Sequence, residues 1–207
     1  MKKYFWLPAI LVFAIASCKK EDMGANSASN TDFPNAVGNH WRYKYTISGL
    51  LTDYIDVDVV GQGTLPDGQK ANIWVSRIQS FNDTSYVVSN GGIVKVYNKP
   101  CWVCTKPMPY ERMRYVLPLQ TGNSWFTNAF YGDTTKVLGQ SILAVPAGTF
   151  ANTYELSKTR GYVTNSRTNN RVWVTPGVGI TKLNQVEFSL GGVPGNGLWE
   201  LDSYSLK

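Results

Sequence analysis

The chain has 207 residues, of which 43% are hydrophobic, 13% aromatic and only 16% charged, and its formal net charge is +6. This content excludes a disordered chain, and the 19 Gly and 10 Pro favour strands joined by turns over a helical bundle. Because His40 is the single histidine, most His-based catalysis and most transition-metal sites are excluded.

Residues 1–17 have the features of a signal peptide. Two lysines precede an apolar run over residues 4–16, which is shorter than the roughly 20 residues of a membrane-spanning helix. The sequence Ile-Ala-Ser-Cys at residues 15–18 resembles the bacterial lipobox. This resemblance implies cleavage before Cys18, diacylglycerol on its thiol and a further acyl chain (palmitate) on its amino group, and such chains together anchor a protein stably. The alternative is an ordinary secretory signal in which Cys18 is incidental.

Residues 18–32 are predicted to be the lipidated cysteine and a disordered tether, because they are polar and lack apolar periodicity. The charged residues 19–22 are similar to the start of Bacteroidetes-type lipoproteins, which implies a lipid-anchored place in the outer membrane and favours the cell surface. Loss of residues 1–17 removes two of the 20 basic side chains and leaves 18 against 14 acidic ones, a net charge of +4. The Lys and Arg residues are scattered, so nucleic acid is rejected as a partner.

Two cysteines, Cys101 and Cys104, are separated by two residues. In an exported chain they are expected to form a local disulfide that holds the segment 99–109 in one shape. A redox pair, free thiols and a metal site are the alternatives, whereas Thr105 stands where a c-type haem would need histidine.

From Trp41 onward the apolar residues follow a period of two, which predicts strands. In chain order the predicted strands cover residues 55–60, 73–78, 86–88, 93–97, 112–117, 154–156, 162–164, 172–174, 180–190 and 198–206, with a hairpin turn at Gly91-Gly92 and a polar turn over 165–170. Residues 33–207 are therefore expected to form one all-β domain, either a single antiparallel curved sheet or a half-open barrel.

One motif occurs twice. Pro34-x3-Gly38-Asn39-x-Trp41 recurs at residues 118–125 with identical spacing and an offset of 84 residues. Glycine and asparagine favour a tight turn, and tryptophan then begins a strand with a large buried face. We interpret the repeat as the same turn-into-strand device in both halves of the domain; a duplicated ligand-contact element is the alternative.

Three short motifs, at residues 117–125, 145–150 and 173–179, together look like those of a group of Bacteroidetes-type lipoproteins with curved antiparallel sheets. This group is distantly similar to the half-barrels of lipoprotein-carrier domains. The resemblance implies a fold but no activity, so it supplies no catalytic residues.

Carboxylate pairs and aromatic residues are the candidate functional side chains in the sequence. Asp56 and Asp58, like Glu200 and Asp202, are two residues apart, which is typical of the solvent face of a strand and also suits a cation or acid–base work. His40 is expected at an exposed turn position. Aromatic residues that could stack on sugars or fill the core are Trp41, Tyr43, Tyr45, Trp102, Tyr110, Trp125, Phe126, Phe130 and Tyr131.

These observations favour a lipid-anchored envelope protein that acts as a non-catalytic binding module for a glycan, a lipid or a protein. It reaches the membrane through Cys18, and no catalytic residue, metal site or cofactor is expected. A structural accessory lipoprotein of an envelope complex is the alternative. A hydrolase in which Asp56 and Asp58 meet Glu155 or Glu187 ranks last.

Overall fold

The computed structural model describes residues 33–47, 51–79, 81–100, 103, 109–128, 132–159, 169–190 and 193–207. The predicted signal peptide, the predicted lipidation site Cys18, the tether and the predicted disulfide pair Cys101 and Cys104 lie outside these residues.

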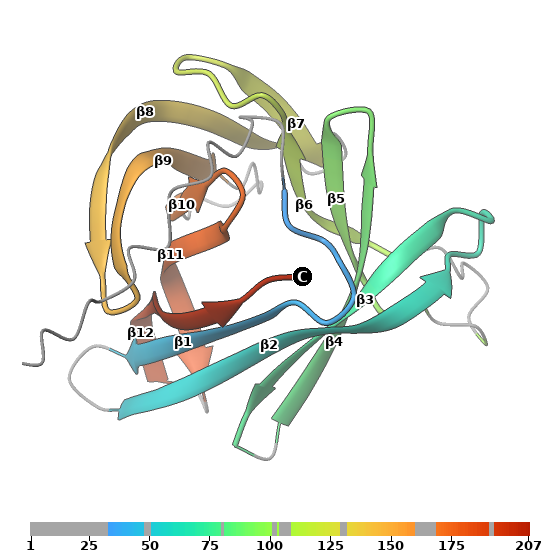
Figure 1. The fold of residues 1–207 in the computed structure, drawn as a ribbon, viewed down its shortest axis with the longest axis horizontal. Coiled ribbons are helices and arrows are strands. Elements are labelled where there is room, and N and C mark those ends of the chain that lie inside the picture. Colours follow the sequence, from blue (N-terminus) through green and yellow to red (C-terminus); the bar gives the residue numbers. More distant parts are fainter. Residues whose placement is uncertain are drawn as a thin grey trace, which may run out of the picture.

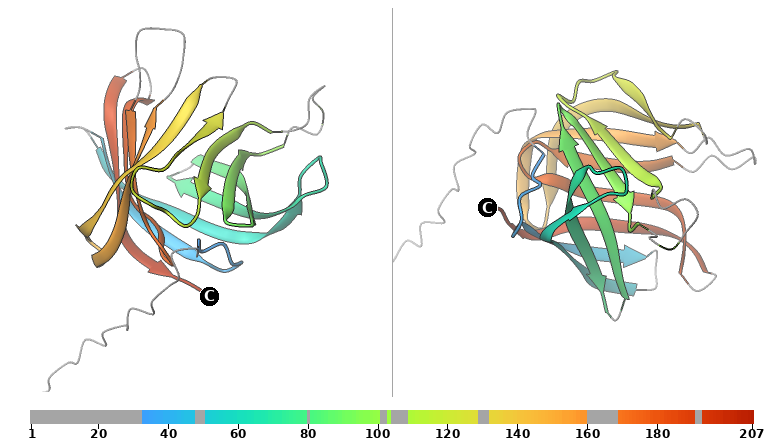
Figure 2. Two further views of the ribbon diagram at one scale, coloured as in Figure 1. Left: turned by 90° about the horizontal axis from the view of Figure 1, so that it is seen from above. Right: turned by 90° about the vertical axis from the view of Figure 1, so that its right-hand side faces the viewer.

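Within the described residues, twelve strands form one antiparallel sheet (Figure 1). They are β1 (His40–Ile47), β2 (Leu51–Thr64), β3 (Lys70–Ile78), β4 (Phe81–Asn90), β5 (Ile93–Asn98), β6 (Glu111–Val116), β7 (Ser124–Asn128), β8 (Asp133–Val145), β9 (Gly148–Thr159), β10 (Asn169–Thr175), β11 (Gly179–Leu190) and β12 (Val193–Ser205). Strands that follow each other in sequence are paired, apart from β6 and β7, which form the two edges of the sheet. In addition, β12 pairs with β1, which joins the two halves of the sheet. The sheet curls until it is nearly closed, as the side views of Figure 2 also show, and this confirms the prediction of an all-β half-open barrel.

The period of two explains why one face of the first strands is buried. Trp41, Tyr43 and Tyr45 point to the inside of the barrel with 1%, 5% and 2% of their surface exposed. They lie opposite Val57, Ile55 and Asp53 of β2, in that order, and the two apolar partners are buried as well. Alternate residues therefore line the interior. No helix in the described part of the chain is long and apolar enough to cross a membrane.

The repeated motif forms the same structure twice. Gly38 and Gly122 have φ angles of 93° and 91°, which glycine adopts without strain. In the first copy the backbone N–H of Gly38 donates to Val59 O at 2.9 Å, and in the second that of Gly122 donates to Val137 O at 2.9 Å. Each turn thus begins one half of the barrel, β1–β6 or β7–β12, as the shared-device interpretation predicts.

The two tryptophans of the motif tie the halves together. Trp41 in the first half donates its indole N–H to Val178 O in the second at 2.7 Å. Trp125 in the second half donates to Arg114 O of β6 at 2.9 Å, across the seam between the two edge strands. The Trp125 hydrogen bond therefore bridges the seam between β6 and β7, where the described residues form no backbone ladder.

Some predicted boundaries are wrong. Asn169 and Asn170 belong to β10 and pair with Thr159 and Lys158, whereas the sequence predicts a polar turn there. The neighbouring strand β9 continues the hydrogen-bond ladder past the apolar residues, so polar side chains are drawn into the sheet. The long strand β8 has no counterpart among the predicted strands, and the predicted strand 162–164 lies outside the described residues.

Candidate functional site

The barrel has two ends that differ in what fills them. Because neighbouring strands alternate in direction, the odd-numbered strands start, and the even-numbered strands finish, at the same end. We call this the arm end, because residues 33–39 cross it before β1 begins, beside the C-terminus (Figure 1). We call the opposite end the polar end for the side chains described below.

The arm end is filled by its own chain. Phe33 stacks between Trp74 and Tyr115, with ring centroids 6.1 and 5.2 Å apart. The Asn35 Oδ1 atom accepts a hydrogen bond from Trp74 Nε1 at 2.7 Å, and Asn35 O accepts one from the Asn72 side chain. Around this arm the inward side chains are almost all apolar, and many, such as Val87, are 1% exposed or less. The interior at the arm end is thus a packed core.

At the other end the inward-facing residues become polar. On β4, Asp83 and Ser85 are on the same face as buried Val87, and on β9, Lys158 is on the same face as buried Leu156. On the other strands, every second residue from a buried inward-facing residue also faces inward, and the pairing register identifies further polar residues on this face. These are Asp53, Ser76, Asp133, Thr135 and Asn170. Polar side chains therefore form a ring around the interior at this end.

Arg112 joins this ring through a β-bulge. The pairing of β5 with β6 shifts at this point, so that Met113 faces Val96 while Glu111 faces Tyr97, and Arg112 is the extra residue. A bulge re-aims a side chain. The Arg112 guanidinium donates to Asp83 Oδ2 at 2.5 Å and to Ser85 Oγ at 3.4 Å.

Water reaches part of this ring, although Asp133 and Thr135 are buried. Arg112 and Asp83 keep 43% and 42% of their side-chain surface exposed although both face the interior. The Lys158 ammonium crosses from β9 to β6, where it donates to the backbone carbonyl of Arg112. The polar end therefore combines solvent access with hydrogen-bonding groups.

Aromatic rings face the interior on the opposite wall. The rings of Tyr45 on β1 and Trp199 on β12 meet edge to face, with centroids 5.8 Å apart. The Trp199 Nε1 atom is buried and has no hydrogen-bond acceptor among the described residues. Since a buried N–H without a partner costs free energy, this donor is a feature that a bound molecule would satisfy.

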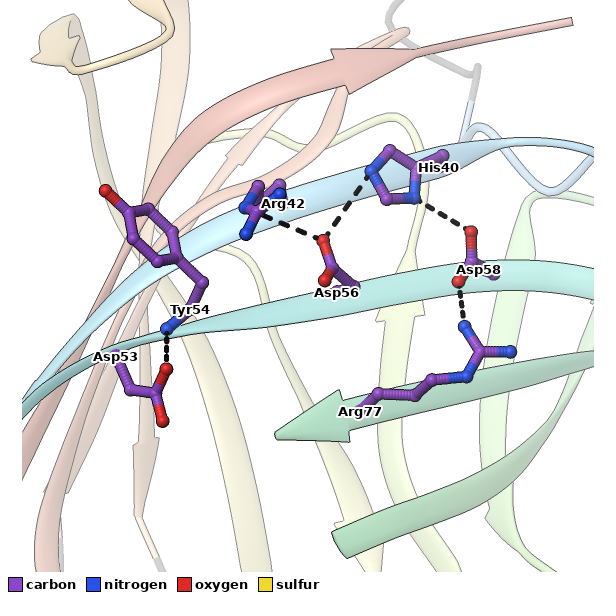
Figure 3. A network of polar contacts seen from close by, with 7 residues as sticks. All are labelled: His40, Arg42, Asp53, Tyr54, Asp56, Asp58 and Arg77. Atoms are coloured by element: carbon purple, nitrogen blue, oxygen red, sulfur yellow. Dashed lines mark hydrogen bonds and ion pairs between the residues drawn. The ribbon is translucent and has the colours of Figure 1, made fainter. Parts of the chain in front are cut away.

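The carboxylate pair singled out in the sequence lies on the outer face (Figure 3). Asp58 accepts from His40 Nδ1 at 2.8 Å and from the Arg77 guanidinium, and Asp56 lies 3.8 Å from Arg42 Nε. The prediction that His40 occupies an exposed turn is wrong. His40 is the first residue of β1, its side chain is 36% exposed, and its ring is bonded to Asp58. Asp53, by contrast, lies on the other face of β2 from Tyr54 in Figure 3. Solvent-facing ion pairs of this kind add little stability.

The other carboxylates of the hydrolase hypothesis are also paired. Glu155 on β9 accepts from Arg171 at 2.8 Å, and Glu200 on β12 accepts from Lys182 at 3.0 Å. Four strands separate β9 from β2 in the sheet, so Glu155 does not join Asp56 and Asp58, and that hypothesis is wrong for this residue. The side chain of Glu187 lies outside the described residues. Among the described side chains, no three His, Cys, Asp or Glu residues are grouped so that they could hold a metal ion.

The polar end is absent from the sites that the sequence predicts. The prediction for the aromatics places Trp41, Tyr43 and Tyr45 correctly on one face, but that face is buried. Of the other predicted aromatics, Phe126 is 60% and Tyr110 38% exposed, Trp125 packs against the core, and Trp102, Phe130 and Tyr131 lie outside the described residues. Asp83 and Ser85 alternate in register with Val87, but Tyr86 and Val88 make the other face of β4 apolar as well, so this alternation alone does not assign them to the interior.

Comparisons with known proteins add little to this geometry. No model of a protein family matches the chain, and no curated protein matches it. A crystal structure from Parabacteroides distasonis ATCC 8503, of a protein provisionally described as a lipoprotein, is similar at a TM-score of 0.40 and 15% identity, over 84% of this chain and 97% of that one. At this TM-score the similarity carries no argument about fold or function.

Proposed function

We propose that the protein is a lipid-anchored envelope protein that binds a polar ligand, without catalysis, inside the polar end of its barrel. The observation that carries this proposal is the Arg112–Asp83 pair, which faces the interior and is still about two fifths exposed. Inward charged groups are costly to desolvate, so an interior built only to pack would be apolar there, as it is at the arm end. A polar, preformed and solvent-accessible interior is what a binding site needs.

The anchor and its position rest on the sequence. Cys18 is the proposed lipidation site, the outer membrane is the proposed location, and Cys101 and Cys104 form the proposed disulfide. The tether over residues 18–32 has 15 residues, for which a flexible chain has a root-mean-square span of roughly 20 Å. Since Phe33 is held at the arm end, a tether of this length favours the arm end near the membrane and the polar end away from it.

Native mass spectrometry of the full chain in detergent tests the proposed function. The probes are a set of polar compounds (oligosaccharides, amino acids and nucleotides) and, as the opposing class, palmitate. We expect an adduct with a polar compound that is lost in Asp83→Asn and retained in Asp58→Asn. The second variant is a matched control, because Asp58 also pairs with an arginine but lies on the outer face. Retention of palmitate alone, or equal binding by both variants, contradicts the proposal.

A further inference from the structure

We infer that the polar end takes a neutral saccharide, an inference that rests on the proposed function and names its ligand class. Three properties of the described residues at this end carry it: the balance of their charges, the mixture of donors and acceptors, and the aromatic rings on the opposite wall.

The charges at the polar end nearly cancel. Among the described inward residues, the carboxylates are Asp53, Asp83 and Asp133 and the cations are Arg112 and Lys158. Arg112 is already paired with Asp83, so it does not present a free positive charge to a phosphate or carboxylate. A strongly charged ligand would therefore be desolvated without a matching counter-charge, which is costly. A neutral ligand avoids this cost.

The hydrogen-bonding groups suit hydroxyls in particular. A carboxylate only accepts, a guanidinium or ammonium group only donates, and serine and asparagine do both. Asp83, Arg112 and Ser85 place all three kinds within one bonded cluster on β4 and β6. A sugar hydroxyl donates one hydrogen bond and accepts others, so neighbouring hydroxyls can use these groups in turn. An alkyl chain would leave the same groups without partners.

The opposite wall offers the second contact that sugars use. The ring of Trp199, which is partly exposed and meets the buried Tyr45 ring edge to face, provides an apolar surface, and the Trp199 N–H lacks an acceptor among the described residues. A sugar ring has an apolar face of C–H groups and a polar rim, so it can contact an aromatic ring and accept from an indole N–H at once. Together the two walls match a molecule that is neutral, hydroxylated and partly apolar.

The test is isothermal titration calorimetry of the full chain in a detergent that contains no sugar, lauryldimethylamine oxide. The probes are maltohexaose, xylohexaose and mannohexaose as neutral saccharides, with hexagalacturonate and glucose 6-phosphate as charged ones. We expect at least one neutral hexasaccharide to bind more tightly than either charged probe. Asp83→Asn is expected to weaken this binding about tenfold or more, because the ligand loses a hydrogen bond to a charged group. Asp58→Asn is expected to leave the binding unchanged.

A further variant, Trp199→Phe, keeps an aromatic ring and removes the N–H, and it is expected to weaken binding by about fivefold to tenfold. Circular dichroism checks that each variant keeps the fold of the parent chain. Absence of binding by all three neutral probes at millimolar concentration overturns the inference, as does tighter binding of a charged probe. If a charged or other polar probe binds and Asp83→Asn abolishes this, the proposed function stands and only the saccharide class fails. If Asp83→Asn and Asp58→Asn behave alike, both fail.

Discussion

One hydrogen bond joins the start of the domain to its C-terminus at the arm end, and its contribution to stability can be measured. The backbone N–H of Lys207 donates to Asn39 Oδ1 at 2.8 Å, and Asn39 is 2% exposed. Asn39→Ala removes the acceptor, and truncation of the chain after Leu206 removes the donor. Each change leaves the turn itself in place, because Asn39 makes its other bonds through the backbone, from its N–H to Ala36 O and from Val59 N–H to its carbonyl.

The expected costs differ because the two partners differ in exposure. After Asn39→Ala, the Lys207 N–H at the exposed terminus can bond to water, so we expect a loss of about 1 to 1.5 kcal/mol in the free energy of unfolding. After truncation, the Asn39 oxygen loses its donor and the packing of Lys207 on Gly38 is lost as well, so we expect about 1 to 3 kcal/mol. If the hydrogen bond accounts for both losses, the double variant shows a coupling energy of about 1 kcal/mol.

The repeat provides the control. Asn123 holds the equivalent position in the second half with the same backbone hydrogen bonds, but its residue is exposed. Asn123→Ala is therefore expected to change stability by less than about 0.5 kcal/mol. Urea unfolding, followed by tryptophan fluorescence, gives the free energy of unfolding of the parent chain and of all four variants. The reasoning is refuted if the two changes at Asn39 and Lys207 add to within about 0.3 kcal/mol, or if Asn123→Ala costs as much as Asn39→Ala.

Three further predictions follow from single contacts. Gly92→Ala is expected to lower the free energy of unfolding in urea by more than about 2 kcal/mol, because its Cβ would lie 2.8 Å from Leu117 O at a φ of 78°. Gly91→Ala, which has open space around its Cβ and a φ of 57°, is expected to lower it by about 1 kcal/mol. Equal losses in the two variants would refute the clash at Gly92. Burial, and secondarily a neighbouring tyrosine, raises the pKa of Tyr43 far above 10.0, so the folded protein keeps this proton while the unfolded chain loses it. The free energy of unfolding should thus be insensitive to this group below about pH 9 and fall above about pH 10, by up to about 1.4 kcal/mol per pH unit, and Tyr43→Phe should reduce that slope; an unchanged slope would argue against the assignment. Trp125→Phe removes the side-chain bond across the seam, so amide hydrogen exchange in β6 and β7 should accelerate more than exchange in β1 and β12, whereas uniform acceleration would show that the bond does not hold the seam.

The turn of the repeated motif and the strand face that follows it could be predicted from the sequence, because local signals agree there. In the repeated motif, glycine at a positive φ, the strand-initiating tryptophan and the period of two after it all indicate the same turn and the same buried face. The alternation alone is therefore enough to assign Trp41, Tyr43 and Tyr45 to one face of a strand. The partner of the Trp41 indole, Val178 O, is 137 residues away, and nothing local indicates it.

The polar end could not be predicted, because both faces of β4 and β5 are partly apolar. Leu65, in the turn between β2 and β3, is buried with Ala71 and Tyr97, and Tyr86 and Val88 pack against this cluster on the outer face. Alternation therefore does not reveal whether Asp83 and Ser85 or their neighbours point inward. Arg112 reaches the interior through a bulge, and a bulge depends on the pairing of two strands, which the sequence of one strand does not determine.

The division of the interior into an apolar and a polar half follows from the number of strands. Twelve strands enclose more volume than the side chains of small barrels fill, so an extra piece of chain must occupy part of it or water must. At the arm end the segment 33–39 supplies that piece, and the residues around it, such as Trp74 and Tyr115, are apolar because they are dry. No described segment plays this part at the polar end, and there the inward positions carry Asp83 and Arg112. Hydration alone would require only that these positions be polar. It does not require a bulge that turns an arginine inward onto an aspartate, and this bonded pair is why we place a ligand, rather than water alone, at the polar end.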